Sequence, residues 1–319
     1  MSFISLMRTI GFKLESPAYA STTVLSATDY NIPAFNINYD PSIALEARKI
    51  ARGDLSKDVS IAGKRSIKIT FDIAVAYSGT GTVAPSYFKV LQACAMKQTT
   101  PSSNVVLTTD ATMTKTPAAI EIQEKEEGAT PSAVLIKARG CMGNAKLALN
   151  NVGEVVKISF DFMGVLESIT DRANASLLVP TGFDSPLPDA VLSASIKVFT
   201  EAQTLNKVTI DLGNKVELYT DPSKSEGYQG AHVVERNPTM ETDQDLELIA
   251  TRGDYARFTG NTTGAFTMDV GSHIILTAPA VQIIKAYAPG EREGHVTNNH
   301  SYEMKRGASG NDDFVITHS

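Results

Sequence analysis

The chain has 319 residues, of which 42% are apolar and 20% are charged, and its formal net charge is −6. This composition is typical of a globular protein with a buried core, and the length allows two ordinary domains or one large β unit. A sequence-independent nucleic-acid binder needs a basic face for phosphates, so the acidic balance argues against that class. The two cysteines, Cys94 and Cys141, are expected to be free thiols in a reducing cytoplasm.

Residues 1–45 carry few charges and contain Pro17, Pro33 and Pro41, which predicts an extended N-terminal arm with turns. The opening segment includes Arg8 and has no cleavage-site pattern, so we do not expect a signal peptide. No apolar run approaches the roughly 20 residues that a membrane-spanning helix needs.

Two short stretches further along are near-copies of one another. "SIKITFDIAV" (66–75) and "VVKISFDFMGV" (155–165) both contain Lys-Ile-Thr/Ser-Phe-Asp, and apolar and polar residues alternate in each. A period of two is typical of a strand that covers a core on one side only. We therefore expect the two stretches to be equivalent edges or neighbours of one sheet.

Pro85 and the stripe Phe88, Leu91 and Ala95 predict a short helix between these two stretches, followed by several short strands. Residues 173–190, with three prolines and a glycine, predict a linker. After it the strand pattern resumes and ends in a hairpin whose tip is "APGEREGHVTNN". The predicted organisation is therefore an arm (1–45), a first β domain (46–172), a linker (173–190) and a second β domain (191–319).

The two predicted β domains contain similar sets of strands. "GEVVKISFDF" and "NKVTIDLGNKVELY" share a strand type, and "ARGD" at 51–54 has a partner in "TRGD" at 251–254. These matches favour a duplicated domain, and the alternative is that β proteins reuse such patterns by chance.

Residue patterns that carry chemistry are missing from the sequence. The five histidines are dispersed, and "SGTGT" lacks the Gly-Lys-Ser/Thr of a phosphate loop. The acidic clusters at 240–247 and 310–313 lack the ligand spacing of a calcium loop. We expect no enzyme, no metal and no cofactor; an enzyme would need Asp72, Asp161 and a histidine to meet in space.

The polar residues of the two near-copies suggest a structural role instead. A half-polar sheet leaves edges that invite pairing with other chains, and closing a ring satisfies them. The polar side chains would then form an inner wall with lateral ion pairs, or else face solvent on a monomer. The candidate lumen-lining residues are Lys68, Thr70, Asp72, Lys157, Ser159 and Asp161.

The order of several segments along the chain carries a resemblance to a known family. These are "KLESPAYA", "SIAGKRSIKITFDI", "GTGTVAPSYFKVLQACAM", "TIDLGNKVE", "ERNPTMETD" and "APGEREGH…SYEMKR…GNDDFVI". In this layout the chain resembles the major tail tube proteins of long-tailed phages with non-contractile tails. The segment Ser16-Pro17-Ala18-Tyr19 departs from the family pattern, in which an acidic residue followed by Tyr-Gly is common.

The resemblance implies a mainly β fold: two tandem tail-tube-type β-sandwich or barrel domains, each with a short flanking helix, assembled into stacked rings. The inner β-barrel of each ring would form the channel for genome delivery, which DNA passes without specific binding. Two such domains per chain imply three chains per ring, and a single tube domain with a decoration implies six. Further partners would be the tape measure, tail terminator and distal tail proteins, and the location would be the phage tail, after synthesis in the host cytoplasm.

The expected contacts between stacked rings are the loop Ala47–Lys57 and the closing hairpin around Pro289–Asn299, because such tips project from the sheet and carry charges of both signs. Their candidate residues are Arg48, Arg52, Asp54, Lys57, Glu291, Arg292 and Glu293. The alternative function is a cytoplasmic or surface β-sandwich binding module, which would be a stable monomer with an aromatic-lined groove.

Overall fold

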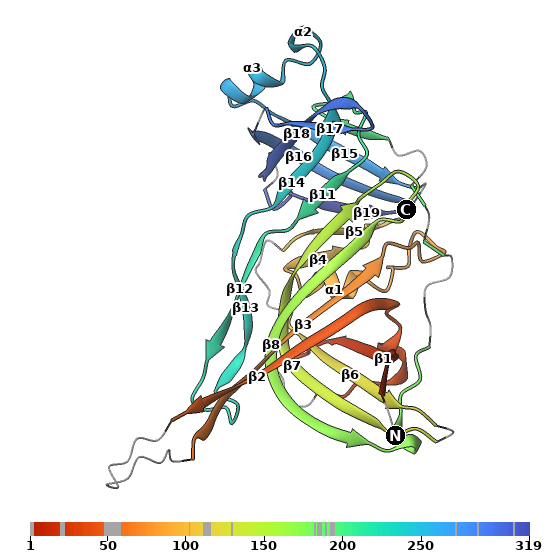
Figure 1. Ribbon diagram of the computed structural model, residues 1–319, viewed down its shortest axis with the longest axis vertical. Helices are drawn as coiled ribbons and strands as arrows, with labels where there is room; N and C mark the ends of the chain where they lie inside the picture. The colour runs from red at the N-terminus through yellow and green to blue at the C-terminus, as the bar shows by residue number, and fades with distance from the viewer. Residues whose placement is uncertain are drawn as a thin grey trace.

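The computed structural model describes residues 3–19, 23–47, 59–101, 103–110, 116–128, 130–181, 183, 187–188, 190–191, 195–271, 273–285, 287–308 and 310–319. Within these ranges the chain is mainly β (Figure 1). We call β1 to β8 the first half and β9 to β19 the second half.

The first half contains eight strands and two short helical segments, in this order: β1 (Phe3–Leu14), η1 (Ala27–Tyr30), β2 (Ala34–Glu46), β3 (Ile61–Ala74), α1 (Phe88–Gln92), β4 (Met96–Thr99), β5 (Val105–Thr109), β6 (Ala118–Glu126), β7 (Ala133–Leu149) and β8 (Lys157–Arg172).

The short 3₁₀ segment η2 (Asn174–Ser176) leads to the second half. Its elements are, in order, β9 (Ile196–Val198), β10 (Glu201–Ala202), β11 (Val208–Asp211), β12 (Asn214–Thr220), β13 (Tyr228–Arg236), β14 (Thr239–Asp245), α2 (Ile249–Arg252), α3 (Asp254–Thr259), β15 (Thr263–Val270), β16 (Ile274–Lys285), β17 (Pro289–Arg292), β18 (His295–Lys305) and β19 (Val315–His318).

The strands of both halves belong to one antiparallel sheet, apart from β12 and β13, which form a separate hairpin. The first half occupies one end of the elongated molecule and the second half, apart from the β12–β13 hairpin, the other, with β19 pairing with both β5 and β16 between them (Figure 1). The described part of the chain therefore has one continuous hydrogen-bonded framework.

The two near-copies are neighbouring strands, as the sequence predicted. They lie in β3 and β8, which pair antiparallel with Phe71 opposite Phe160. Their alternate apolar side chains are buried, because a strand presents successive residues to opposite faces of a sheet. Phe162 follows on the same buried face and packs against Phe71 and Phe12, with ring centroids 5.8 and 5.6 Å apart.

The two halves repeat one strand order. Neighbours in the first half run β1–β6–β7–β8–β3–β2. Neighbours in the second half run β9–β15–β16–β18–β14–β11, and every pair in both series is antiparallel. Six strands thus occur twice in the same order along the chain and across the sheet.

The registers also repeat. Asp40 pairs with Lys68 as Asp211 pairs with Thr239, so both residue numbers differ by 171 (211 − 40 and 239 − 68). The same difference holds where Glu46 pairs with Ile61 and Glu217 pairs with His232. The β2–β3 hairpin therefore corresponds to the longer hairpin that runs from β11 through β12 and β13 to β14.

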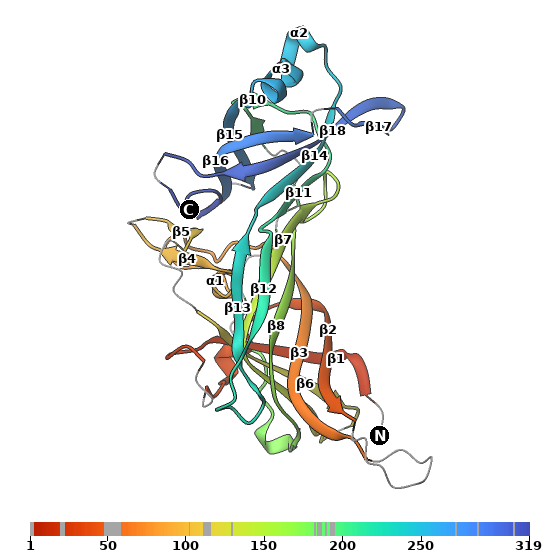
Figure 2. The same cartoon turned by 90° about the vertical axis from the view of Figure 1, so that its left-hand side faces the viewer.

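The hairpin of β12 and β13 folds back along the first half (Figure 2). Gly213 permits the bend, since its φ is +62° and an added Cβ would lie 1.9 Å from the carbonyl oxygen of Asn237. Arg139 of β7 donates from Nη1 to the carbonyl oxygen of Gln229 at 3.2 Å and from Nη2 to a carboxylate oxygen of Glu226 at 2.7 Å. These contacts hold the hairpin against β7.

Some expectations differ from the structure in detail. Residues assigned to an N-terminal arm form β1 and β2, which pair with β6 and β3, so this segment is part of the first half's sheet. β1 buries Ile10 and Phe12 in the core. The predicted helix after Pro85 is present as the five-residue α1, and the described residues of the predicted linker include η2 and a bridge between Ala190 and Val155. Both cysteines are free and buried.

Candidate functional site

A continuous polar face covers one side of the sheet across both halves. One row of cross-strand partners runs from Asp72 on β3 to Glu303 on β18. Its members in spatial order are Asp72, Ser159, Lys146, Asp211, Thr239 and Glu303. The opposite side of the same strands carries the core, so this polar face is the side of the sheet that is open to an interaction.

The six predicted lumen-lining residues all lie on this polar face, on the adjacent strands β3 and β8. Thr70 stands opposite Asp161 and Asp72 opposite Ser159. Lys68 forms an ion pair with Asp161 at 2.8 Å, and both side chains are about half exposed (52% each). The expected lateral ion pair is therefore present, although such an exposed pair contributes only about 0–1 kcal/mol to stability.

The remaining charged members of the set contact β2. Asn36 donates from Nδ2 to a carboxylate oxygen of Asp72 at 2.8 Å. The ammonium of Lys157 lies 5.9 Å from the ring centroid of Phe35. The two strands thus place the six side chains together on one wall, where each charge has a neighbour.

The polar face crosses from one half to the other where β7 pairs with β11. Lys146 stands opposite Asp211, and Asn144 donates from Nδ2 to Oδ1 of Asp211 at 2.7 Å. Asn214 donates from its side-chain amide to the carbonyl oxygens of Cys94 and Gly143. Backbone pairing and these buried hydrogen bonds make the junction specific.

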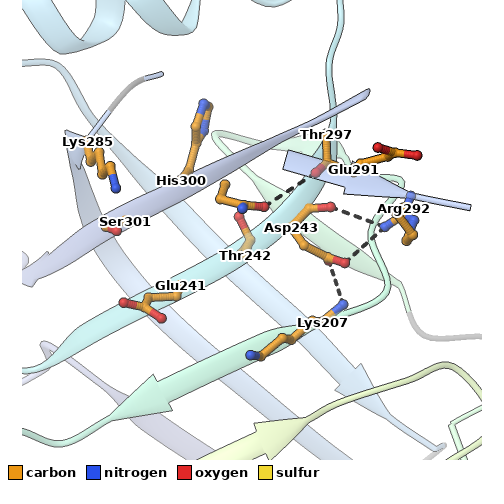
Figure 3. A pocket seen from close by; sticks show the side chains of 11 residues that line it. Lys207, Glu241, Thr242, Asp243, Lys285, Glu291, Arg292, Thr297, His300 and Ser301 are labelled. Carbon is orange, nitrogen blue, oxygen red and sulfur yellow. Dashed lines mark hydrogen bonds and ion pairs between the residues drawn. The ribbon is translucent and has the colours of Figure 1, made fainter. Parts of the chain in front are cut away.

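A polar pocket of about 390 Å³ opens on the second half's part of the polar face (Figure 3). Arg292 donates to Oδ2 of Asp243 at 3.2 Å and also pairs with Asp245. Among the side chains that Figure 3 labels, Lys285, Glu241 and Glu291 add charge around it. Sequence reasoning missed this half of the polar face, because its strands do not repeat the Lys-Ile-Thr/Ser-Phe-Asp pattern.

The predicted ring-stacking residues are only partly covered by the structure. Arg48, Arg52, Asp54 and Lys57 lie outside the described residues. Glu291, Arg292 and Glu293 lie in the β17–β18 hairpin, whose existence the sequence predicted. Arg292 anchors this hairpin to β14 of its own chain, and the role of the three residues between rings stays a prediction.

Asp72, Asp161 and a histidine, which an enzyme would need to bring together, are not joined by the contacts of the described residues. His300 is buried on the core-facing side of β18, where Gln244 and Asn298 each contact a ring nitrogen at 2.6 Å. Its ring also contacts the hydroxyl of Tyr302 at 2.9 Å, and burial raises the pKa of that hydroxyl. This network is a satisfied polar part of the core.

The described residues contain no cluster of three His, Cys, Asp or Glu side chains that could hold a metal ion. Within the same residues, no helix is long and apolar enough to cross a membrane. A comparison with known protein families found no match, and a comparison with curated proteins found no significant relative.

Proposed function

We propose that the chain is a structural protein of a phage tail tube, of the kind found in long non-contractile tails. In this role it polymerises as stacked rings that form the channel for genome delivery. The observation that carries the proposal is the β7–β11 pair, which joins two copies of one strand order into a single polar-faced sheet. A wall that repeats a unit side by side is what a ring requires.

The free edges of the sheet support ring closure. Among the described residues, β2 pairs only with β3, and β17 pairs only with β18. Unpaired edges at the two ends of a sheet are templates for pairing with other chains. In the β7–β11 pair the edge strand of one half joins the other half, and β2 is the counterpart of β11 in the repeated strand order.

Repetition within the chain favours three copies per ring. If each half is a tail-tube-type domain with its own helix, α1 in one and α2–α3 in the other, three chains supply six domains with pseudo-sixfold symmetry. A chain with one tube domain and a decoration would need six copies. The matched registers of the two β-hairpins are the reason for preferring three.

The polar face would line the channel. It mixes acidic and basic side chains, and the chain as a whole carries a net charge of −6. A surface without a dominant positive field does not retain phosphates, so DNA would pass without specific binding. Tape measure, terminator and distal tail proteins would be the further partners in the virion.

Electron microscopy of the purified protein over a range of concentrations tests this function. Native mass spectrometry of the smallest closed ring gives the number of chains in it. We expect rings or tubes, with a mass of three chains per ring. Six chains would contradict the stoichiometry, and a protein that stays monomeric at high concentration would overturn the function in favour of the binding module.

A further inference from the structure

The β2–β3 hairpin extends past the core and carries exposed apolar side chains. We call Ile43–Glu46 of β2 with Ile61–Arg65 of β3 the β2–β3 arm. Ile43 is 47% exposed, Leu45 70% and Ile61 55%. Apolar side chains gathered on a projecting hairpin mark an interaction surface.

The corresponding hairpin of the second half has a partner inside the chain. By the shared register, Ile43 corresponds to Asn214 and Ile61 to His232. Asn214 donates from its backbone amide to the side-chain oxygen of Asn144 on β7 at 3.0 Å. Further along, His232 contacts Tyr19, with 2.7 Å between Nδ1 and the hydroxyl oxygen. The β12–β13 hairpin is thus docked on the unit next to it.

The strand that would receive the β2–β3 arm can be identified by the same correspondence. Met142 of β7 pairs with Met163 as Gln282 of β16 pairs with Glu303, and both numbers differ by 140 (282 − 142 and 303 − 163). β7 has a register irregularity between Ala138 and Cys141 in its pairing with β6. β16 has one at the corresponding place, between Ala278 and Val281, in its pairing with β15. β16 is therefore the counterpart of β7.

The counterpart of the docking position on β7 is exposed and has exposed apolar neighbours. Asn144 pairs with Asp161, whose counterpart is Ser301 (161 + 140). Ser301 pairs with Lys285, because a register irregularity between Ile283 and Lys285 shifts the pairing by one residue, so the docking position lies at the end of β16. Beside Lys285, Ile284 is 47% exposed and Tyr287 is 65% exposed. The second half thus presents apolar side chains where the first half is covered by β12 and β13.

We propose that the β2–β3 arm of one copy packs against the end of β16 in the next copy, with Ile43 beside Lys285 and the apolar side chains of both surfaces in contact. The inference rests on the proposed ring, and it names the surfaces that join its chains. The partner is a second copy of this chain, because the docking geometry has its template in the contact of the β12–β13 hairpin with β7.

Disulfide cross-linking tests the position. Two single variants, Ile43→Cys and Lys285→Cys, are mixed under assembly conditions and oxidised mildly; native Cys94 and Cys141 are fully buried. We expect a covalent dimer from the mixture and none from either variant alone. The matched control replaces Ile43→Cys with Ile169→Cys, which alters an equally exposed isoleucine elsewhere on the first half (50% exposed) and should give no dimer.

Substitution tests the apolar contact. Ile43→Ser with Ile61→Ser should leave the melting temperature of the monomer unchanged and raise the concentration needed for assembly at least about tenfold, since two apolar side chains lose their burial. Ile169→Ser with Val234→Ser is the control, with unchanged assembly expected. This inference would be overturned, with the tube function left standing, by either of two results. One is normal ring assembly of the Ile43→Ser and Ile61→Ser variant; the other is that rings of the mixed cysteine variants form no covalent dimer on oxidation. A wild-type chain that never assembles would overturn both.

Discussion

Lys146 of β7 and Asp211 of β11 stand opposite each other in the pair that joins the two halves. Each belongs to a different copy of the repeated strand order, so this contact inside one chain has the geometry of a contact between units. The residues around it fix its specificity, and the bend at Gly213 directs the hairpin that follows.

Replacing Gly213 with alanine should destabilise the protein strongly. The left-handed backbone at this position disfavours any side chain by about 1–2 kcal/mol, and the added Cβ would lie 1.9 Å from the carbonyl oxygen of Asn237. Gly253→Ala is the matched control, because Gly253 has the same φ of 62° and no atom within 4 Å of the added Cβ. Urea unfolding should show a clearly larger loss for Gly213→Ala; equal losses would contradict the close contact.

Phe162→Ala should remove about 3–5 kcal/mol of unfolding free energy, because the ring is fully buried among Phe12, Phe71 and Phe160. Phe258→Ala on α3, where the side chain is 38% exposed, should change stability by less than about 1 kcal/mol. Denaturant unfolding of the two variants compares them directly. A small effect of Phe162→Ala would mean that this cluster is not the centre of the core.

Glu15→Gln should stabilise the protein increasingly as pH rises from 4 toward 8. Burial raises the pKa of the Glu15 carboxyl, although the Gly140 amide donates to it at 2.7 Å. The folded protein therefore holds this proton more tightly than the unfolded chain. The wild type loses stability as pH rises from the unfolded pKa of about 4.5 through the raised folded pKa.

Glutamine does not titrate, so the difference in melting temperature between Glu15→Gln and the wild type should grow across that window and then level off. Thermal unfolding at four or five pH values measures it. Glu154→Gln on the surface serves as the control. A difference that is the same at every pH would show that Glu15 has no raised pKa.

Asp72→Lys combined with Asp161→Lys should leave rings intact and impair genome delivery. Both carboxylates lie on the polar face, and loss of the exposed Lys68–Asp161 pair costs no more than about 1 kcal/mol. New lysines would attract phosphates in the channel. Ring formation is measured by microscopy, and delivery by DNA release from assembled particles.

The charge-matched control for that variant is Glu217→Lys with Glu235→Lys, on the β12–β13 hairpin, where delivery should be unaffected. If the polar-face variant unfolds instead, the two aspartates are structural. If it assembles and delivers DNA normally, the polar face does not line the channel.

Much of the first half's fold could be predicted from local patterns. The alternation in β3 and β8 fixes which side chains are buried, and the shared Lys-Ile-Thr/Ser-Phe-Asp motif marked the strands as neighbours, which their pairing confirms. The helix after Pro85 is present but short, because Ala95 already has a positive φ and begins the turn into β4. Such a local turn is set by packing and leaves no periodic signal.

The second half of the polar face could not be predicted in the same way. Its charges are on β11, β14 and β18, which have no common motif, and they become neighbours only through pairs such as Lys146 with Asp211. The repeated strand order is likewise carried by register and not by residue identity. The 171-residue correspondence between the hairpins therefore follows from the strand pairings and has no counterpart in the sequence pattern.

The junction between β7 and β11 has a consequence for assembly kinetics. Tethered units meet at an effective concentration on the order of millimolar, whereas separate chains meet at the concentration of the protein itself. In a ring of three chains, every second joint would be formed already during folding. Only the alternate joints would respond to dilution. Fusing two units therefore halves the number of joints that form between separate chains and leaves a single type of joint through which ring formation is controlled.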